Sequence, residues 1–433
     1  MNKFIYFFVA LFLVISLTSC STARFFKQSN PQLAVINESG PAELPSLTNL
    51  STDEVYGHCL LLPETTDIEL VLLTHCAKEL LSRDDLSLEY RRYGVSKYNL
   101  ALYKLVASDK QKINIEKRVR LNYSRPINFI FSDEMLAIDD RLSPNFFGEI
   151  GIPVVTNRNN QQLGLEVYYP LEGILRDATI VMTQVKIQDD SFNVSLDILF
   201  QSDKSAIEIG TNNFLLRHSP GSAFLALIEK ADIDDFNWLG FVSPAKAEKR
   251  RGIFAIGDIS KDKVPIIMVH GLNSDPLIWK YLTMSILNEP ALFSRYQIWH
   301  VYYPSGPPPF YTASRTRDDL QSFLTVLDSP TVAEHAVIIG HSMGGIISKL
   351  LATKTDFTLW DTAFNKRPDE ILTEEFTEVK NVFIFEPVFK KSKIFFMDTP
   401  FKGSEVANST IAHIGALLVT LPTEFTGDLP LKL

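Results

Sequence analysis

The sequence predicts an α/β protein with a parallel sheet in its C-terminal domain, preceded by a small α-helical hairpin and a β-rich domain. Three observations support this prediction. Near the start of the chain apolar residues recur at helical spacing, in its middle they tend to alternate with polar residues, and from Val264 onward short apolar runs alternate with helical segments. Strands that alternate with helices usually lie parallel, because each helix returns the chain to the same edge of the sheet.

The composition is that of an ordinary globular protein with more than one core. The chain has 433 residues, of which 45% are hydrophobic and 21% charged, so a disordered chain is not expected and two or three domains are. The net charge of -9 argues against nucleic acid as a partner, since phosphate binding needs a basic face. The densest basic run, residues 246–251, is interpreted as a solvated linker.

The first residues predict export. Lys3 precedes an apolar stretch, residues 4–17, that is shorter than the ~20 residues needed to span a bilayer, so residues 1–19 are expected to be a signal peptide. The stretch ends in Leu17-Thr18-Ser19-Cys20, which resembles the bacterial lipobox. That resemblance implies acylation of Cys20, for example with palmitate, and anchoring in the membrane. The alternative is an ordinary signal peptide with an incidental cysteine.

The residue after the lipobox cysteine bears on the destination. Ser21 is not the aspartate that, in enteric bacteria, tends to retain lipoproteins at the inner membrane. We therefore expect a bacterial envelope protein at the outer membrane, facing the periplasm.

A tether and a helical region are expected next. Residues 20–51 are rich in Asn, Pro, Ser and Thr without a sustained period, which is typical of a tether. Residues 67–82 and 87–106 have helical apolar spacing and predict an α-hairpin within a helical region over residues 52–108.

Two cysteines remain once Cys20 is set aside. Cys59 and Cys76 can close a disulfide in an oxidising periplasm. Two free buried thiols are the second possibility. A metal site is the third, because His58 and His75 precede the cysteines, although four-ligand zinc sites usually have tighter spacing.

A β-rich domain is predicted over residues 109–243. Alternation of apolar and polar residues indicates four strands. They cover residues 113–123, 127–131, 180–187 and 192–200. Residues 244–251 are interpreted as a hinge, and no catalytic constellation is found before it.

The C-terminal domain is expected over residues 252–433. Its predicted strands cover residues 265–269, 298–303, 336–339 and 394–397, and its predicted helices cover residues 277–287, 313–327 and 344–353. This order of elements is the one expected for a sheet of parallel strands joined by helical crossovers.

A nucleophile motif lies between the third of these strands and the helix that follows it. The sequence Gly340-His341-Ser342-Met343-Gly344 fits Gly-x-Ser-x-Gly, in which a sharp strand-to-helix turn exposes the serine hydroxyl. Only small residues fit beside such a turn, which accounts for Gly340 and Gly344. The helix dipole favours negative charge at that end. The sequence therefore predicts Ser342 as a nucleophile; a purely structural turn is the alternative.

A second motif provides an oxyanion hole. The first strand of the domain ends in His270-Gly271-Leu272, and the backbone N–H groups of Leu272 and Met343 are expected to bind the oxyanion of a tetrahedral intermediate. His270 and His341 are expected to support the loop and the elbow, and not to act as bases.

These motifs give the C-terminal region a family resemblance. Residues 264–407 resemble the bacterial esterase and lipase group related to GPI inositol-deacylases and triacylglycerol lipases. Besides the two motifs, the resemblance rests on Tyr296-Gln297-Ile298-Trp299, Tyr303-Pro304-Ser305-Gly306 and Asp398-Thr399-Pro400-Phe401-Lys402-Gly403-Ser404. Phe401 and Lys402 stand where that family has His and Arg, which concerns the packing of this loop. The resemblance implies an α/β-hydrolase sheet.

The rest of a catalytic triad is not identifiable in the sequence. In α/β-hydrolases an acid and then a histidine follow the serine, but after Ser342 the only histidine is His413. His413 lies in an apolar run, residues 411–421, that is expected to form a helix or lid. We therefore expect the domain to lack its last strands, and with them the acid and the base.

The sequence favours a serine carboxylic-ester hydrolase that acts on lipid or other apolar esters through an acyl-enzyme on Ser342. No metal and no organic cofactor is required for that chemistry. Two alternatives remain: an inactive, truncated hydrolase that serves as an envelope binding or scaffold lipoprotein, and an acyltransferase with the same nucleophile.

Overall fold

A computed structural model describes most of the chain. The described residues are 23–29, 31, 43–110, 119–231, 250–305, 307, 309–364, 366–371 and 377–402. The signal peptide, Cys20, His413 and residues 244–249 of the predicted hinge lie outside these ranges. Among the described residues, no helix combines the length and the hydropathy needed to cross a membrane.

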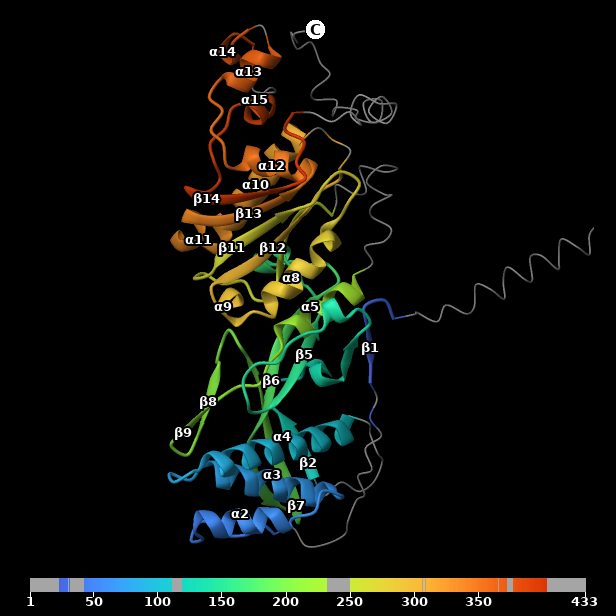
Figure 1. Ribbon diagram of the computed structural model, residues 1–433, viewed down its shortest axis with the longest axis vertical. Coiled ribbons are helices and arrows are strands. Elements are labelled where there is room, and N and C mark those ends of the chain that lie inside the picture. The colour runs from blue at the N-terminus through green and yellow to red at the C-terminus, as the bar shows by residue number, and fades with distance from the viewer. Residues whose placement is uncertain are drawn as a thin grey trace, which may run out of the picture.

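A layer of three helices occupies one end of the elongated molecule (Figure 1). They are α2 (Thr52–Leu61), α3 (Asp67–Leu81) and α4 (Leu88–Lys110). Two of these helices begin with a capping box. At α2 the side chains of Ser51 and Glu54 each accept a hydrogen bond from the backbone N–H of the other residue, and at α3 those of Thr66 and Glu69 do the same. These pairs satisfy N–H groups that a helix leaves without partners at its start.

A disulfide joins α2 to α3. Cys59 and Cys76 are bonded, with their Cα atoms 5.7 Å apart, and both residues are buried. The pairing is the first of the three possibilities that the sequence left open.

Removing this disulfide should destabilise the helical layer. The bond closes a loop with a sequence separation of 17 residues, and closure of a loop of this size stabilises a protein by about 3 kcal/mol. The Cys59→Ala/Cys76→Ala double variant should therefore lose about 2–4 kcal/mol of unfolding free energy in urea titrations followed by circular dichroism. Dithiothreitol should lower the unfolding free energy of the unmodified protein by the same amount and should leave that of the double variant unchanged. Equal midpoints for the two proteins would contradict this assignment.

The segment interpreted as a tether contains a strand. β1 (Phe26–Gln28) pairs antiparallel with β4 (Met135–Ala137), and the Glu229 carboxylate accepts hydrogen bonds from the backbone N–H groups of Arg24 and Phe25 at 3.0 and 2.6 Å. The interpretation of residues 20–51 as a continuous tether is therefore wrong for this part. Its short strand is fixed by long-range partners that local composition does not reveal.

The middle of the molecule is a five-stranded sheet with the order β2-β7-β6-β5-β3. The strands are β2 (Val119–Tyr123), β3 (Asn128–Phe131), β5 (Ile152–Arg158), β6 (Ile174–Gln188) and β7 (Ser191–Phe200). A hairpin and several short helical turns surround it: β8 (Ala206–Ile209), β9 (Asn212–Leu215), η1 (Ser132–Glu134), η2 (Asp140–Leu142) and η3 (Gly164–Tyr168). Apolar side chains from the sheet form one core with α3 and α4.

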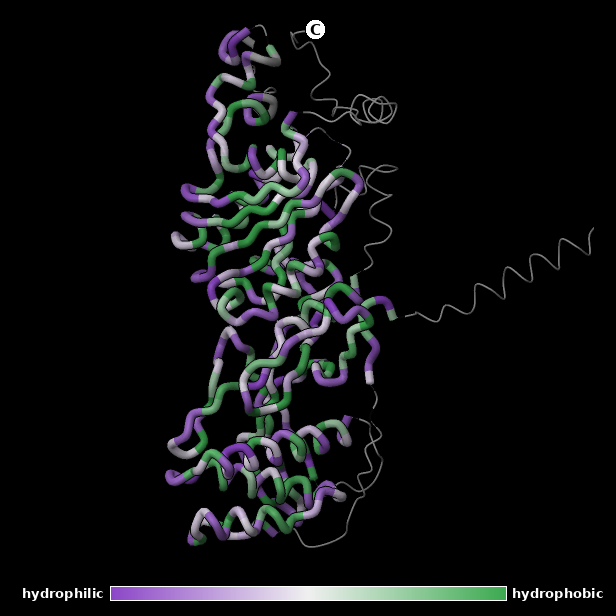
Figure 2. Tube along the Cα trace, in the orientation of Figure 1, coloured by the Kyte–Doolittle hydropathy of each residue, from purple (hydrophilic) through white to green (hydrophobic). Residues whose placement is uncertain are grey.

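The C-terminal end is a second five-stranded sheet, with the order β10-β12-β11-β13-β14. Its strands are β10 (Gly252–Ile256), β11 (Val264–Val269), β12 (Tyr296–Tyr302), β13 (His335–His341) and β14 (Lys391–Met397). The strand β10 is antiparallel to β12, and the other pairs are parallel. Figure 2 shows apolar residues along the middle of these strands, as expected for a sheet covered on both faces.

Helices cover the two faces of this sheet. The helices and turns of the C-terminal part are η4 (Pro276–Trp279), α8 (Lys280–Leu287), α9 (Pro290–Phe293), α10 (Pro309–Leu327), α11 (Pro330–Glu334), α12 (Met343–Leu351), α13 (Thr358–Ala363), α14 (Pro368–Ile371) and α15 (Thr377–Phe383). One face packs against α10 and α12. The other packs against α8 and against α5 (Pro220–Lys230), which follows the middle sheet in the chain.

The middle and C-terminal parts therefore meet in one buried cluster. Phe224, Leu225 and Ile228 of α5 belong to the same buried cluster as Met268 of β11 and Met284 of α8. As a consequence, side chains from both parts can line one cavity.

The strand β14 forms an edge of the described sheet. It pairs with the nucleophile strand β13 over its whole length, and among the described residues no strand lies on its other side. Phe395, Phe396 and Met397 are exposed to 56%, 42% and 45%.

Candidate active site

Ser342 occupies the turn between β13 and α12. Its φ and ψ angles are 53° and -124°, a conformation that L-residues rarely adopt and that is found at functional sites. Its backbone N–H donates to the carbonyl oxygen of Met397 at the end of β14, at 2.8 Å. The neighbouring strand thus holds the strained turn that the Gly-x-Ser-x-Gly pattern predicts.

Close backbone contacts explain the two motif glycines. A Cβ atom on Gly340 would lie 2.4 Å from the Ser348 hydroxyl oxygen and 2.5 Å from the carbonyl oxygen of Gly344. A Cβ atom on Gly344 would lie 2.2 Å from the carbonyl oxygen of His270 and 2.3 Å from that of Val269. Helix α12 therefore begins pressed against the end of β11, and this contact requires glycine.

The expected oxyanion loop lies directly beside the elbow. A Cβ atom on Gly271 would be 3.0 Å from the Cβ atom of Ser342 and 3.0 Å from Nδ1 of His341. Leu272, the next residue, is half exposed. Met343 is the first residue of α12, where backbone N–H groups have no partner within the helix. The structure thus brings the two predicted donor residues to the same turn as the nucleophile.

His270 is a structural residue. It is fully buried, its ring stacks on that of Tyr303 with centroids 4.2 Å apart, and its Nδ1–H donates to the carbonyl oxygen of Gly271 at 3.0 Å. Its Nε2 accepts from the backbone N–H of Tyr303 at 3.4 Å. Burial lowers the pKa of His270 to about 4, so the ring is neutral at neutral pH and both of its nitrogens make hydrogen bonds.

Two further residues hold the loop and were not singled out individually in the sequence. The Tyr303 hydroxyl donates to the carbonyl oxygen of His270, and the Ser305 hydroxyl accepts from the backbone N–H of Asn273 at 3.0 Å. Both belong to the Tyr303-Pro304-Ser305-Gly306 stretch that carries part of the resemblance. Their function follows from the position of this stretch after β12, next to the loop that follows β11.

No base is placed at the nucleophile by the described part of the chain. Within the described ranges no imidazole or carboxylate makes a hydrogen bond to Ser342, and Nδ1 of His341 is buried without a hydrogen-bond partner. His413 cannot be placed, because it lies outside the described residues. The geometry therefore places a serine hydroxyl at a strained turn beside the loop after β11, an arrangement that suits attack on an acyl carbon.

Comparison with known families agrees with this geometry. Residues 266–400, from β11 to the loop after β14, match the alpha/beta hydrolase family. Neither the curated proteins nor the solved structures contain a match to the chain. The matched segment includes the elbow and the oxyanion loop, and it excludes the helical layer, the middle sheet, α5 and β10. The family match and the strained turn at Ser342 together support placing residues 266–400 in the alpha/beta hydrolase superfamily.

Proposed function

We propose that this chain is a serine carboxylic-ester hydrolase whose nucleophile is Ser342. The observation that carries the proposal is the strained elbow at Ser342 with Gly271 against its Cβ atom. Strain of this kind is expected to persist only where the surrounding structure enforces it, and a strained elbow of this type presents the serine hydroxyl to a bound substrate.

The proposed reaction is acyl transfer through an acyl-enzyme. The Ser342 oxygen attacks the ester carbonyl carbon and gives up its proton, and the N–H groups of Leu272 and Met343 bind the resulting oxyanion. As the carbonyl reforms, the bond to the ester oxygen breaks and the leaving group takes up that proton to depart as the alcohol. Water then attacks the acyl-enzyme and releases the acid. An acyltransferase would differ only in the acceptor of this second step.

A fluorophosphonate probe tests this proposal, because it reacts with activated serine hydroxyls and not with ordinary ones. Covalent labelling of the full chain at Ser342, found by peptide mapping, supports the hydrolase. A chain that stays unlabelled supports the scaffold alternative, which is favoured by one observation: the described residues place no base at Ser342.

We further propose that the protein is anchored at the bacterial envelope by lipid on Cys20. The lipobox-like sequence supports this proposal. The position of the residues before β1 adds to it, because the backbone N–H groups of Arg24 and Phe25 are hydrogen-bonded to the Glu229 carboxylate of α5. Four residues of extended chain span at most about 14 Å. An anchor at Cys20 would therefore hold the protein close to the membrane surface on the side of α5, where lipid esters are the substrates within reach.

Cys20→Ser should abolish the anchor. The thiol is the acylated group, and without it the precursor should keep its signal peptide and fail to incorporate labelled palmitate. The measurement is metabolic labelling followed by membrane fractionation of the bacterium that expresses the chain. Replacing the neighbouring Ser21 by alanine should leave labelling intact. Acylation of the Cys20→Ser protein would rule out the lipobox interpretation.

A further inference from the structure

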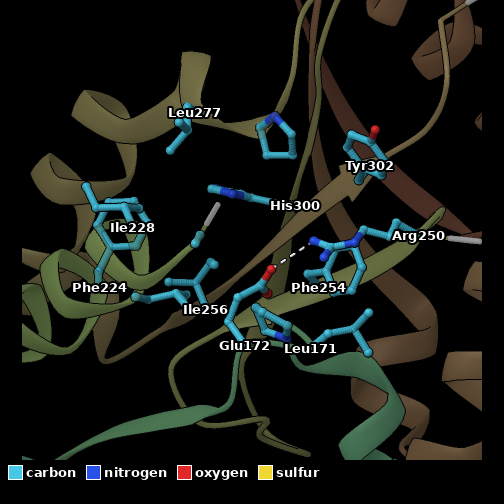
Figure 3. Close-up of a pocket in the computed structure, with 14 residues that line it drawn as sticks. Leu171, Glu172, Phe224, Ile228, Arg250, Phe254, Ile256, Leu277, His300 and Tyr302 are labelled. Carbon is cyan, nitrogen blue, oxygen red and sulfur yellow. Dashed lines mark hydrogen bonds and ion pairs between the residues drawn. The ribbon is translucent and has the colours of Figure 1, made fainter. Parts of the chain in front are cut away.

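An apolar cavity lies where α5 meets the C-terminal sheet (Figure 3). Its volume is about 100 Å³. Phe224 and Ile228 of α5 form one wall, Leu277 of η4 another, and His300 and Tyr302 of β12 a third. Ten of its fourteen lining residues precede residue 266. The cavity is therefore formed mainly by parts of the chain outside the segment that matches the hydrolase family.

The polar groups around the cavity are paired or neutral. Arg250 and Glu172 form an ion pair at 2.9 Å, which Figure 3 shows as a dashed line. Nε2 of His300 lies 2.9 Å from the Thr283 hydroxyl oxygen, and burial lowers the pKa of His300 to about 3. The lining thus presents no unpaired charge at neutral pH, which suits a hydrocarbon group and disfavours an ion.

Two elements that line the cavity are adjacent in sequence to the oxyanion loop or to a residue that packs on it. Pro276 and Leu277 belong to η4, which begins five residues after Gly271. Tyr302 ends β12, and the next residue, Tyr303, stacks on His270. The strand β12 is separated from the nucleophile strand β13 by β11 alone, and two strand spacings amount to about 10 Å. The cavity and Ser342 therefore have the loop after β11 as a common neighbour, since Leu277 lines the cavity and Gly271 lies against Ser342.

We propose that this cavity binds the hydrocarbon chain of the ester's acyl group. That the ligand is an ester rests on the proposed function. That its hydrocarbon chain enters this cavity rests on the lining and the position of the cavity. An apolar cavity of about 150 Å³ stays dry and admits benzene, so this cavity suits a short or medium chain. Helix α5 also binds the start of the described chain, because its Glu229 accepts hydrogen bonds from the backbone of Arg24 and Phe25. A protein anchored at Cys20 would therefore present this cavity toward the lipid.

Binding can be measured without turnover. The full-length Ser342→Ala protein should bind n-hexanol saturably in ligand-observed NMR. Leu277→Trp in the same background places a large side chain in the cavity from its partly exposed wall and should weaken binding at least tenfold. Leu292→Trp, at an exposed position of α9 that does not line the cavity, should bind as the parent does. The proposal is overturned if the Ser342→Ala protein does not bind n-hexanol. It is also overturned if the Leu277→Trp protein binds n-hexanol as tightly as the parent does.

Substrate selectivity provides the second test. Hexanoate has four methylenes more than acetate, and each methylene buried in an apolar site contributes about fourfold. Leu277→Trp should therefore lower the hexanoate-to-acetate ratio of kcat/KM for p-nitrophenyl esters by tenfold or more. An unchanged ratio overturns the assignment to the acyl chain. Acetate hydrolysis that survives Ser342→Ala would instead refute the proposed function, so the two failures are distinguishable.

Discussion

Replacing Ser342 by alanine is expected to abolish fluorophosphonate labelling and to remove Ser342-dependent ester hydrolysis altogether. The hydroxyl oxygen is the atom that forms the covalent bond, so its loss leaves no acyl-enzyme. In a serine hydrolase with its base in place, removing the nucleophile costs on the order of 10⁶ in kcat. Without a base, an elbow with an oxyanion loop retains only about 10³–10⁴ over water. The wild-type rate on a p-nitrophenyl ester therefore also reports whether a base is present in the folded chain.

The control for this variant is a serine without strain. Ser285 lies exposed on α8 and donates only to the carbonyl oxygen of Tyr281 in its own helix, at 2.8 Å. Ser285→Ala should label and hydrolyse as the wild type does. Alanine at position 342 would have to adopt the same positive φ angle that serine adopts there. The unfolding free energy of the variant, measured in urea, should therefore be close to that of the wild type. Labelling that persists in Ser342→Ala would place the nucleophile elsewhere.

The elements of the C-terminal sheet were predictable because their signals are local. Buried parallel strands are continuous apolar runs, and such runs predicted β11 and β13 to within three residues at each end. The elbow was equally predictable, since a glycine on each side of a serine at a strand end has a direct steric reason. The family match over residues 266–400 supports the same α/β character.

Other elements escaped prediction because their signals are not local. The strand β5 is buried over its first five residues, so apolar and polar residues do not alternate along it. The short strand β1 is fixed by β4 and by Glu229, which lie more than 100 residues away. Helix α2 lies within the helical region predicted over residues 52–108, but it was not predicted as a separate helix, because it exposes Leu60 and Leu61 and lacks the apolar stripe that marks a surface helix.

The supports of the site illustrate the same limit. Sequence indicated Ser342 and the Gly271-Leu272 loop, but not that Met397 of β14 accepts the hydrogen bond from the nucleophile's N–H. That contact depends on the order of strands in the sheet, and so does the cavity between α5 and β12. Long-range packing, which no local pattern encodes, determines both.

Gly344→Ala is expected to have the largest effect on stability in the C-terminal part. The added methyl group would lie 2.2 and 2.3 Å from two backbone carbonyl oxygens at the end of β11, the central strand of the sheet. The backbone carbonyl groups of Val269 and His270 have little room to move away from the added methyl group, whereas the end of a flexible side chain could. Overpacking a core costs typically 1–3 kcal/mol, and we expect the upper part of this range or more, about 3 kcal/mol. Fluorophosphonate labelling should fall with it, because the methyl group separates the elbow from the oxyanion loop.

A glycine in the sheet on which α12 packs provides the control. Gly252 lies in β10, and a Cβ atom there would meet only the Phe254 ring, at 3.6 Å, an ordinary contact. Gly252→Ala should leave labelling unchanged and raise the free energy of unfolding by up to about 1 kcal/mol, since alanine has less conformational freedom to lose than glycine. Urea unfolding followed by tryptophan fluorescence measures the stability of both variants, since Trp299 is buried in this sheet. If Gly344→Ala were as stable and as reactive as Gly252→Ala, the close packing of α12 on β11 would be wrong, and with it the position of the oxyanion loop beside Ser342.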